Sequence, residues 1–200
     1  MSRTMAPPPL PKLPAGMPPQ GQWTYEDYCR IPGDGKRYEV IRGVLYVCPA
    51  PRTRHQYASG TLHVRLRNFV ETRKLGLVFY SPVDVILPGL ATPVQPDLLF
   101  VCHERLNIIG EKNILGAPDL LIDTLSPSNP SHDRITKFAV YAEAGVKEYW
   151  IVDLKAQTIE IFTLDGGEYR LQGRFGRGST APSRLLEGFA VLVDEVCARV

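Results

Sequence analysis

Two aspartates, Asp97 and Asp123, interrupt short apolar runs of strand length. Asp123 lies within the run 120–125, and Asp97 lies within the mostly apolar run 94–101. A carboxylate in a buried strand costs several kcal/mol unless a metal ion or a cationic side chain pairs with it. Opposed side chains on paired strands have β-carbons about 4.5–5.5 Å apart, so these two carboxylates can share one cation. Because oxygen ligands suit Mg²⁺ and Mn²⁺, we expect Asp97 and Asp123 to form a site for one of these ions.

An ion held in this way suits the hydrolysis of a phosphodiester bond. It polarises the phosphate and helps to generate hydroxide from bound water. A lysine nearby would orient that water or stabilise the charge on the phosphorus. Asp119 is a weaker candidate, because at ~3.3 Å per residue it lies about 13 Å from Asp123 along one strand. We interpret Asp119 as a turn residue or a residue at the start of the strand.

The elements that must position these side chains alternate along the chain. This alternation predicts an α/β fold with a mixed central sheet flanked by helices. The predicted strands are 37–41, 44–47, 77–80, 83–87, 94–101, 120–125, 149–152, 158–164 and 169–171, with 77–87 interpreted as one strand interrupted by Pro82. The predicted helices are 54–75 and 133–144, preceded by a short helix capped by Thr24. Residues 173–179 are interpreted as a surface loop.

The long predicted helix 54–75 carries one apolar stripe and several basic residues. His55 falls on the same stripe as Ala58 and Leu62. Seven Lys or Arg residues and a single acid, Glu71, lie between residues 42 and 83. Such a local basic patch can serve a phosphate backbone although the net charge of the chain is only +2.

Length and composition favour one intracellular domain. Two hundred residues suit a single core, which we place at 21–200. Residues 1–20 contain seven prolines and predict a disordered leader. The four cysteines form no zinc-type cluster and suggest reduced thiols. No signal peptide or membrane span is evident, so we expect a cytoplasmic protein without a membrane partner.

Several motifs in order resemble the Uma2 family of predicted endonucleases. They are Gln95-Pro-Asp-Leu-Leu-Phe-Val101, Pro118-Asp-Leu-Leu-Ile-Asp-Thr-Leu-Ser-Pro-Ser128, Lys137, Tyr141 and Gly145-Val-Lys-Glu-Tyr-Trp-Ile-Val-Asp153. The resemblance covers most of the chain after residue 20. It implies a restriction-endonuclease-like fold with an active site of the PD-(D/E)xK superfamily.

The resemblance also assigns residues to the site. In the superfamily the assisting lysine lies two residues after the second acid, but this chain has Leu125 there. The Uma2 pattern points instead to Lys137, with Tyr141 one turn later, and places Glu39 and His55 around the cleft. The chain has Asp123 where the family more often has Glu. This difference keeps the negative charge but shortens the side chain that carries it.

Each of these residues also has a structural interpretation. Asp97 follows a proline and suits a turn, and Asp123 could form an ion pair with Lys137. By periodicity Lys137 lies off the apolar stripe of its helix, Ile135, Phe138, Ala139 and Ala142, and is an ordinary solvated lysine. His55 suits a hydrogen-bonded core position, and Glu39 suits the exposed face of a hairpin.

Three hypotheses follow. The first is a metal-dependent endonuclease in which Asp97 and Asp123 hold Mg²⁺ or Mn²⁺ and Lys137 and Glu39 assist. Its partner is nucleic acid, expected to be DNA, and a homodimer is expected by analogy with enzymes that cut two strands. Residues Arg52, Arg54, His55, Arg65 and Arg67 are the candidates for nucleic-acid contacts. The second hypothesis is a non-catalytic binding protein with a structural Asp123–Lys137 pair, and the third is a hydrolase of small phosphate esters.

Overall fold

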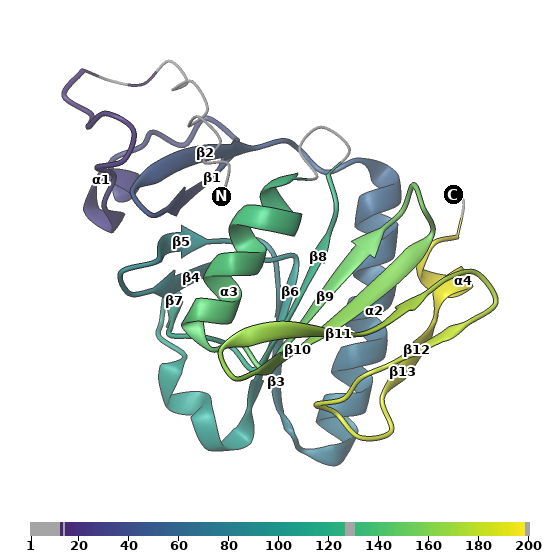
Figure 1. The fold of residues 1–200 in the computed structure, drawn as a ribbon. Coiled ribbons are helices and arrows are strands. Elements are labelled where there is room, and N and C mark those ends of the chain that lie inside the picture. Colours follow the sequence, from purple (N-terminus) through teal and green to yellow (C-terminus); the bar gives the residue numbers. More distant parts are fainter. Residues whose placement is uncertain (1–12, 14, 127–130, 199–200) are drawn as a thin grey trace.

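The structure, a computed structural model, describes residues 13, 15–126 and 131–198 (Figure 1). A six-stranded mixed sheet forms its middle layer. The strands, in spatial order, are β11 (Glu168–Phe175), β10 (Thr158–Asp165), β9 (Glu148–Asp153), β8 (Leu120–Thr124), β6 (Leu98–Cys102) and β3 (Gly76–Tyr80). Strands β8 and β9 are parallel, and the other neighbours are antiparallel.

The central strands are buried on both faces. In β6, Leu98 and Phe100 belong to one core cluster, whereas Leu99 and Val101 belong to a second. Successive strand residues point to opposite faces, so a strand covered on both sides must be apolar at every position. This is why the sequence around Asp97 and Asp123 reads as continuous apolar runs.

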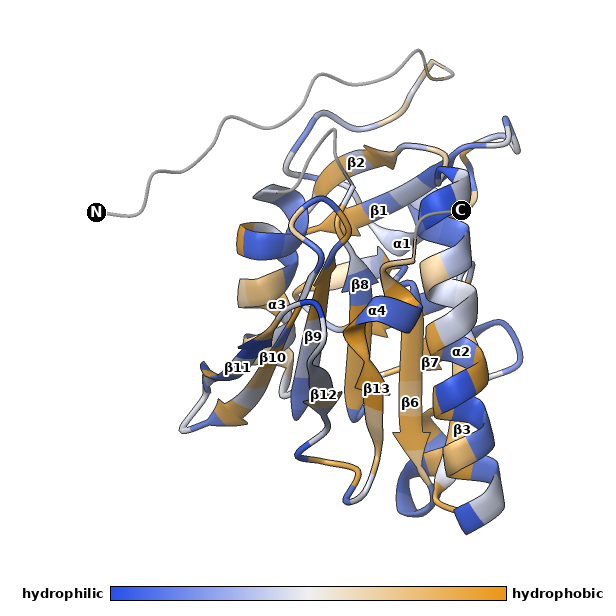
Figure 2. Cartoon of the chain, turned by 90° about the vertical axis from the view of Figure 1, so that its right-hand side faces the viewer, coloured by the Kyte–Doolittle hydropathy of each residue, from blue (hydrophilic) through white to orange (hydrophobic). Residues whose placement is uncertain are grey.

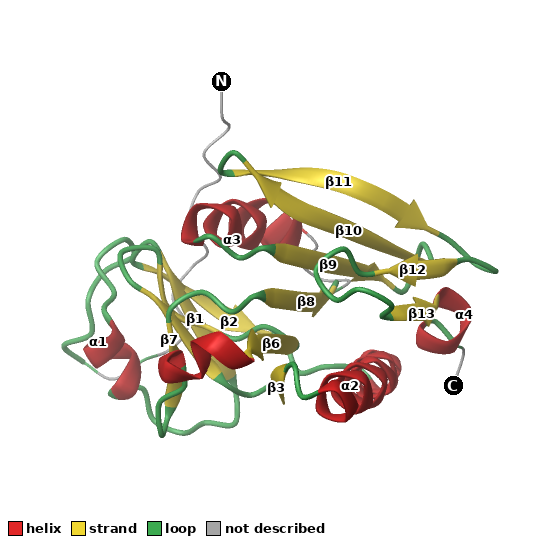
Figure 3. Ribbon diagram, turned by 90° about the horizontal axis from the view of Figure 1, so that it is seen from below, coloured by secondary structure: helices red, strands yellow, loops and turns green. Residues whose placement is uncertain are grey.

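Helices cover both faces of the six-stranded sheet. Helix α2 (Thr53–Arg73) lies on one face, and α3 (Phe138–Ala144) lies on the other (Figure 3). The stripe residues Ala58 and Leu62 of α2 are fully buried, as the helical spacing predicted. Figure 2 shows hydrophilic residues along the outer side of this helix. Strands β12 (Thr180–Pro182) and β13 (Ala190–Leu192) and helix α4 (Val193–Val196) lie beside α2.

A second, five-stranded sheet packs on the α3 side. Its strands, in spatial order, are β2 (Val44–Cys48), β1 (Arg37–Ile41), β5 (Ala91–Val94), β4 (Asp84–Leu87) and β7 (Asn113–Leu115). The hairpin of β1 and β2 was predicted and is confirmed. The side chains of Ile41, Val85 and Val94 share a core cluster with Leu121 and Tyr149 of the six-stranded sheet.

Two strand predictions were wrong because they joined segments that belong to different sheets. The interrupted strand 77–87 is divided between β3 and β4, and the run 94–101 is divided between β5 and β6. The linker between β5 and β6 contains Gln95 and Asp97. Asp97 therefore lies immediately before a strand rather than inside one. The predicted loop 173–179 is also shorter than expected, because β11 continues to Phe175.

The N-terminal segment attaches to the β1–β2 hairpin. Most of the predicted leader, residues 1–20, lies outside the described residues, but Met17 packs against the cluster that contains Trp23. Gln20 donates to the carbonyl of Leu45 and accepts from its amide. Thr24 caps α1 (Tyr25–Cys29), as expected. Contacts with the domain therefore begin at or before Met17.

The predicted fold class is confirmed: a mixed α/β domain with helices on both faces of its six-stranded sheet. A short 3-10 helix, η1 (His103–Ile108), and β7 occupy the connection between β6 and β8. The four cysteines are free. Among the described residues, no helix is both long and apolar enough to cross a membrane.

Candidate active site

Asp97 and Asp123 lie side by side at one end of the six-stranded sheet. Leu98 of β6 pairs with Ile122 of β8, so Asp97 is next to Asp123 when this register is continued by one residue. The amide of Asp97 donates to Asp123 Oδ1 at 3.2 Å, and the amide of Thr124 donates to Asp97 Oδ2 at 2.8 Å. The two side chains are only 7% and 2% exposed. The structure therefore brings the two carboxylates together on the floor of one site.

Lys137 reaches these carboxylates from the opposite element. It lies in the π-helical turn His132–Lys137 that leads into α3. Its Nζ lies 3.0 Å from Glu39 Oε1 and 3.5 Å from Asp123 Oδ1 and from Asp133 Oδ1. The alternative interpretation from periodicity, an ordinary solvated lysine, was wrong, since Lys137 is 5% exposed. The wider π-helical turn shifts the buried face, so that Asp133, Lys137 and Tyr141 point inward while Ile135 is exposed.

Glu39 connects Lys137 to a histidine. It lies on β1 and is completely buried, so the alternative interpretation, in which it faces solvent on a hairpin, was wrong. One carboxylate oxygen accepts from the amide of Gln95 at 2.8 Å, and the other lies 2.8 Å from His132 Nε2. Burial alone would raise the pKa of Glu39, but Lys137 and His132 outweigh it and hold that pKa well below its usual range. Glu39 is thus a charged positioning group for Lys137.

His55 lies at the start of α2 and contacts Asp97. Its Nε2 is 3.0 Å from Asp97 Oδ2, while Arg37 Nη1 lies 3.9 Å from Asp97 Oδ1. Burial disfavours the charged imidazole, but the hydrogen bond to Asp97 and its charge outweigh burial and raise the pKa of His55. His55 therefore belongs to the carboxylate cluster rather than to an apolar core position.

The cluster contains more negative than fixed positive charge. Four carboxylates, those of Glu39, Asp97, Asp123 and Asp133, face the permanent cations Lys137 and Arg37. Burial raises the pKa of Asp123 to about 7, because the favourable charge of Lys137 does not offset burial together with the neighbouring carboxylates. The direct contact with Lys137 thus leaves Asp123 incompletely neutralised.

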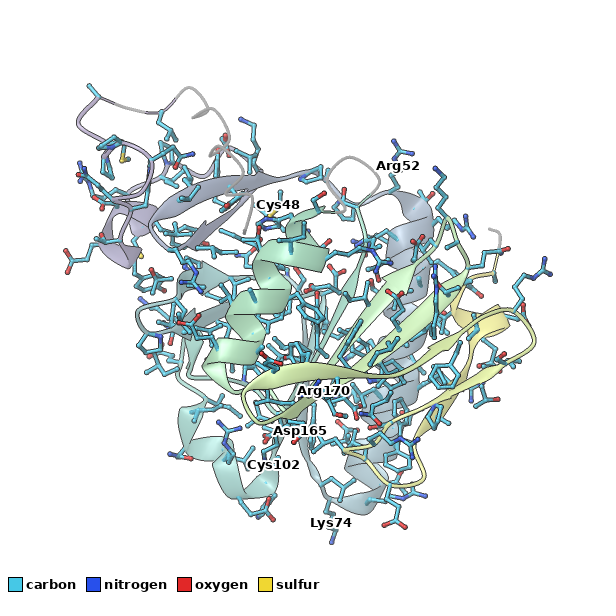
Figure 4. The ribbon with its side chains drawn as sticks, viewed as in Figure 1. Cys48, Arg52, Lys74, Cys102, Asp165 and Arg170 are labelled. Carbon is cyan, nitrogen blue, oxygen red and sulfur yellow. The ribbon has the colours of Figure 1, made fainter. Side chains whose placement is uncertain are left out.

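These residues open into a cavity of about 870 Å³. Asp97, Asp123, Asp133 and Lys137 are among the residues that line it. Its walls come from the end of β2 and the following loop, the start of α2, and the ends of β8 and β9. In Figure 4, Cys48 marks the β2 wall, close to the start of α3, and Arg52 marks the rim where α2 begins.

The predicted nucleic-acid residues fall into two groups. Arg52, Arg54 and His55 line the cavity. Arg65 and Arg67 do not: they lie farther along α2, where Arg65 pairs with Glu195 at 2.7 Å and Arg67 pairs with Glu71 at 2.7 Å. The structure therefore brings the first three to the cavity, and of these His55 contacts a carboxylate of the cluster.

Two further residues lie away from the cavity. Tyr141 is fully buried beneath Lys137, and burial raises the pKa of its hydroxyl well above the usual value. Asp119 lies at the opposite end of β8, where it contacts Arg105 and Lys147. This place agrees with its interpretation as a residue at the start of a strand.

Sequence reasoning missed His132, Asp133, Arg37 and Tyr149. The hydroxyl of Tyr149 donates to Asp123 Oδ2 at 3.0 Å from the neighbouring strand β9. A signal existed for one of them: Asp133, Lys137 and Tyr141 recur every four residues, which places three polar side chains on one helical face. The other three had no local signal, because only the tertiary fold brings them to the site: Tyr149 through the pairing of β9 with β8, Arg37 from β1 of the other sheet, and His132 from the start of the π-helical turn.

No preformed metal centre is evident within residues 13, 15–126 and 131–198, since no group of three or more His, Cys, Asp and Glu side chains there has a suitable arrangement. Two carboxylates alone can nevertheless suit Mg²⁺, which usually keeps several waters and binds one or two protein carboxylates together with substrate phosphates.

Comparisons with known proteins bear on the family and the fold. The Uma2 family model, described as "Putative restriction endonuclease", matches residues 25–194. A similar solved structure is a putative nuclease belonging to DUF820 from Anabaena variabilis, with a TM-score of 0.73 and 16% sequence identity over 88% of this chain and 97% of that chain. At this identity the likeness shows a shared fold. A search of curated proteins gave no match.

Proposed function

The chain belongs to the Uma2 family of putative restriction endonucleases, and from this premise we propose that it hydrolyses phosphodiester bonds in DNA with the help of Mg²⁺ or Mn²⁺. The observation that carries the proposal is the excess of buried carboxylates around Asp97 and Asp123. A divalent cation would neutralise this excess, whereas Lys137 alone does not.

The donor set fits such an ion. Asp97 and Asp123 are hard oxygen ligands, and each carboxylate keeps lone pairs beyond the hydrogen bonds described above. Two residues that line the cavity, Gln95 and Thr124, also keep a buried side-chain oxygen without a hydrogen-bond partner among the described residues. Such oxygens are commonly satisfied by an ion or an ordered water. When bound, the ion would polarise the phosphate and acidify a coordinated water.

Lys137 would act on the phosphate from the other side. Its ammonium lies near Asp123, and Glu39 and Asp133 hold it in place. A fixed positive charge of this kind stabilises negative charge that develops on the phosphoryl oxygens during attack. Glu39 is a positioning residue, because both of its oxygens already bind Gln95, His132 and Lys137.

His55 completes the arrangement around Asp97. Its hydrogen bond fixes the orientation of the Asp97 carboxylate, which also accepts from the amide of Thr124. Because His55 lines the cavity, it can also contact a phosphate there. Arg52 and Arg54 supply positive charge along the same rim.

A non-catalytic protein with a structural Asp123–Lys137 pair is the second candidate. The 3.5 Å contact between the two side chains favours it. The other contacts of Lys137 weaken this candidate. Lys137 lies closer to Glu39, at 3.0 Å, and it also contacts Asp133, so its charge is shared among three carboxylates. A purely structural pair would be expected to lower the pKa of Asp123 rather than leave it raised.

A cleavage assay with matched variants tests the proposal. We expect the wild-type protein to cut labelled DNA in Mg²⁺ or Mn²⁺ and to stop when EDTA is added. Asp123→Asn should lower the rate by at least about a hundredfold. Asp119→Asn is the matched control, a buried aspartate at the other end of the same strand, and its folded fraction should cut at the wild-type rate.

Calorimetry separates the two candidates. Titration with Mn²⁺ should give heat of binding for the wild type and none for Asp123→Asn. An absence of Mn²⁺ binding to the wild type, together with unchanged cleavage by Asp123→Asn, would overturn the proposed site and leave the structural pair.

A further inference from the structure

Part of the cavity lining is apolar although its floor is charged. Val47 near the end of β2 and the following segment from Pro49 to Pro51 contribute on one side, and Leu125 and Leu154, which follow β8 and β9, contribute on another. Hydrolysis of a phosphodiester needs polar contacts only. The apolar part of the lining therefore suits a part of the substrate that is not phosphate. In a nucleic acid the extended apolar surfaces are the faces of the bases.

The cavity lining also contains an aromatic pair. The rings of Tyr46 and His132 lie 4.4 Å apart between centroids, and both residues line the cavity. His132 also binds Glu39 at 2.8 Å, so the pair is connected directly to the residue that holds Lys137. Aromatic side chains are the usual surfaces on which unpaired bases stack.

The depth of the carboxylates limits which phosphates can reach them. Asp97, Asp123 and Lys137 are 7%, 2% and 5% exposed, so the scissile phosphate must enter the cavity. In an intact duplex the base faces are covered by their stacked neighbours and the edges by the opposite strand. Such a phosphate could not bring a base face against Tyr46 unless the nucleotide left the stack.

We propose that the cavity takes the scissile phosphate together with one unpaired nucleotide, so that the substrate is single-stranded or locally unpaired DNA and its base stacks on Tyr46. This inference rests on the proposed function and adds the substrate class. The cavity volume of about 870 Å³ lies within the range of roughly 300–1,000 Å³ typical of pockets that enclose a small organic ligand.

The rim provides charge for the flanking phosphates. Arg52 lies where α2 begins, and Lys155 lies in the turn after β9, so the two come from different walls. Both are exposed, and neither forms an ion pair with a described residue. Positive groups along both sides of an aromatic-lined cavity are typical of single-strand binding sites.

Cleavage of matched substrates tests the substrate class. One labelled DNA oligonucleotide is offered alone, in a perfect duplex, and in a duplex with a bulge of unpaired nucleotides, each with Mn²⁺. We expect the single strand and the bulged duplex to be cut at least about tenfold faster than the perfect duplex, with cuts at the bulge. A perfect duplex cut as fast as the single strand would overturn the inference.

Variants of Tyr46 test the stacking surface. Tyr46→Ala should raise the KM for the single strand about tenfold, whereas Tyr46→Phe, which keeps the ring, should restore it. The exposed Tyr80 lies outside the cavity, and Tyr80→Ala should leave the KM unchanged. An equal loss in the Ala and Phe variants of Tyr46 would mean that its ring provides no stacking surface.

Failure of the inference and failure of the proposed function give different results. If no substrate is cut by the wild type in either metal, the proposed function fails. If all substrates are cut, Asp123→Asn is inactive and the duplex is preferred, the nuclease assignment stands and the unpaired-nucleotide inference fails. Fluorescence anisotropy with Asp123→Asn adds a readout without cleavage: the single strand should bind more tightly than the duplex.

Discussion

Two buried aspartates border strand β8, and their surroundings differ in charge. Asp119, just before the strand, is 0% exposed and accepts from the amide of Cys102 at 2.8 Å. Arg105 Nη1 lies 2.9 Å and Lys147 Nζ 2.8 Å from the same carboxylate. Burial would raise the pKa of Asp119, but these donors outweigh burial and lower it to about 2.

Asp123, at the other end of the strand, is nearly as buried and accepts from the Tyr149 hydroxyl and the Asp97 amide, but it has no positive partner to itself. It has one cation, Lys137, and that cation also contacts Glu39 and Asp133. Burial and these neighbours raise its pKa to about 7. Burial of a carboxylate is thus common to both ends of β8. What distinguishes the candidate site is that its neighbours add more negative charge than they neutralise, which is typical of functional sites.

The largest expected effect comes from removing the shared cation. Lys137→Met should lower the free energy of unfolding by about 3–5 kcal/mol, because Asp123 would be left buried without a positive partner and Glu39 would keep only His132. Lys74→Met is the matched control at the end of α2, where Figure 4 shows the side chain pointing away from the domain. Urea denaturation measures both. A loss below about 1 kcal/mol for Lys137→Met would show that the carboxylates do not depend on this lysine.

The next effect separates the two aspartates. Asp119→Asn should destabilise the domain by about 1.5–3 kcal/mol, because it removes charged hydrogen bonds from Arg105 and Lys147. Asp123→Asn should leave stability unchanged or raise it, since it relieves repulsion among neighbouring carboxylates. Urea denaturation in metal-free buffer compares them. Equal destabilisation by the two variants would remove the distinction between a structural and a functional carboxylate.

Much of the fold follows from local sequence patterns. The β1–β2 hairpin, helix α2 and the buried strands β8 and β9 were all evident from apolar spacing and turn residues. The separation of β3 from β4 was not, because nothing local shows which sheet a strand joins. That choice depends on pairing between residues distant in sequence, such as Tyr80 with Leu98.

The site was also only partly predictable from local sequence patterns. The sequence drew attention to Asp97 and Asp123 because a carboxylate is costly among aliphatic neighbours. Periodicity alone misplaced Lys137, since an α-helical period puts it with solvent and the π-helical turn puts it inside; only the family resemblance pointed to it as a site residue. His132 had no signal at all: its role depends on Glu39, which lies 93 residues away in the sequence.

Lowering the pH should reduce the difference in the free energy of unfolding between the wild type and Asp119→Asn. The pKa of Asp119 is about 2 in the folded protein and about 3.9 in an unfolded chain, so the unfolded chain binds the proton first as the pH falls. The stability that Asp119 contributes is therefore complete above about pH 4 and is lost towards pH 2, by about 2 kcal/mol in total. Urea denaturation of both proteins across this range measures it. A difference that stays constant would mean that the pKa of Asp119 is not lowered by folding.

The smallest expected effect comes from substituting Lys147, one of the partners of Asp119. It tests the comparison between Asp119 and Asp123 at the Asp119 end of β8. Lys147 is 53% exposed and contacts Asp119, which also keeps Arg105 and the Cys102 amide. An exposed partner that can be replaced by water contributes about 0–1 kcal/mol, so Lys147→Met should cost no more than that. The contrast with Lys137→Met then measures how far each aspartate depends on a single cation. If Lys147→Met lost as much free energy of unfolding as Lys137→Met, each aspartate would depend equally on one cation. An excess of negative charge would then no longer distinguish Asp123 from Asp119.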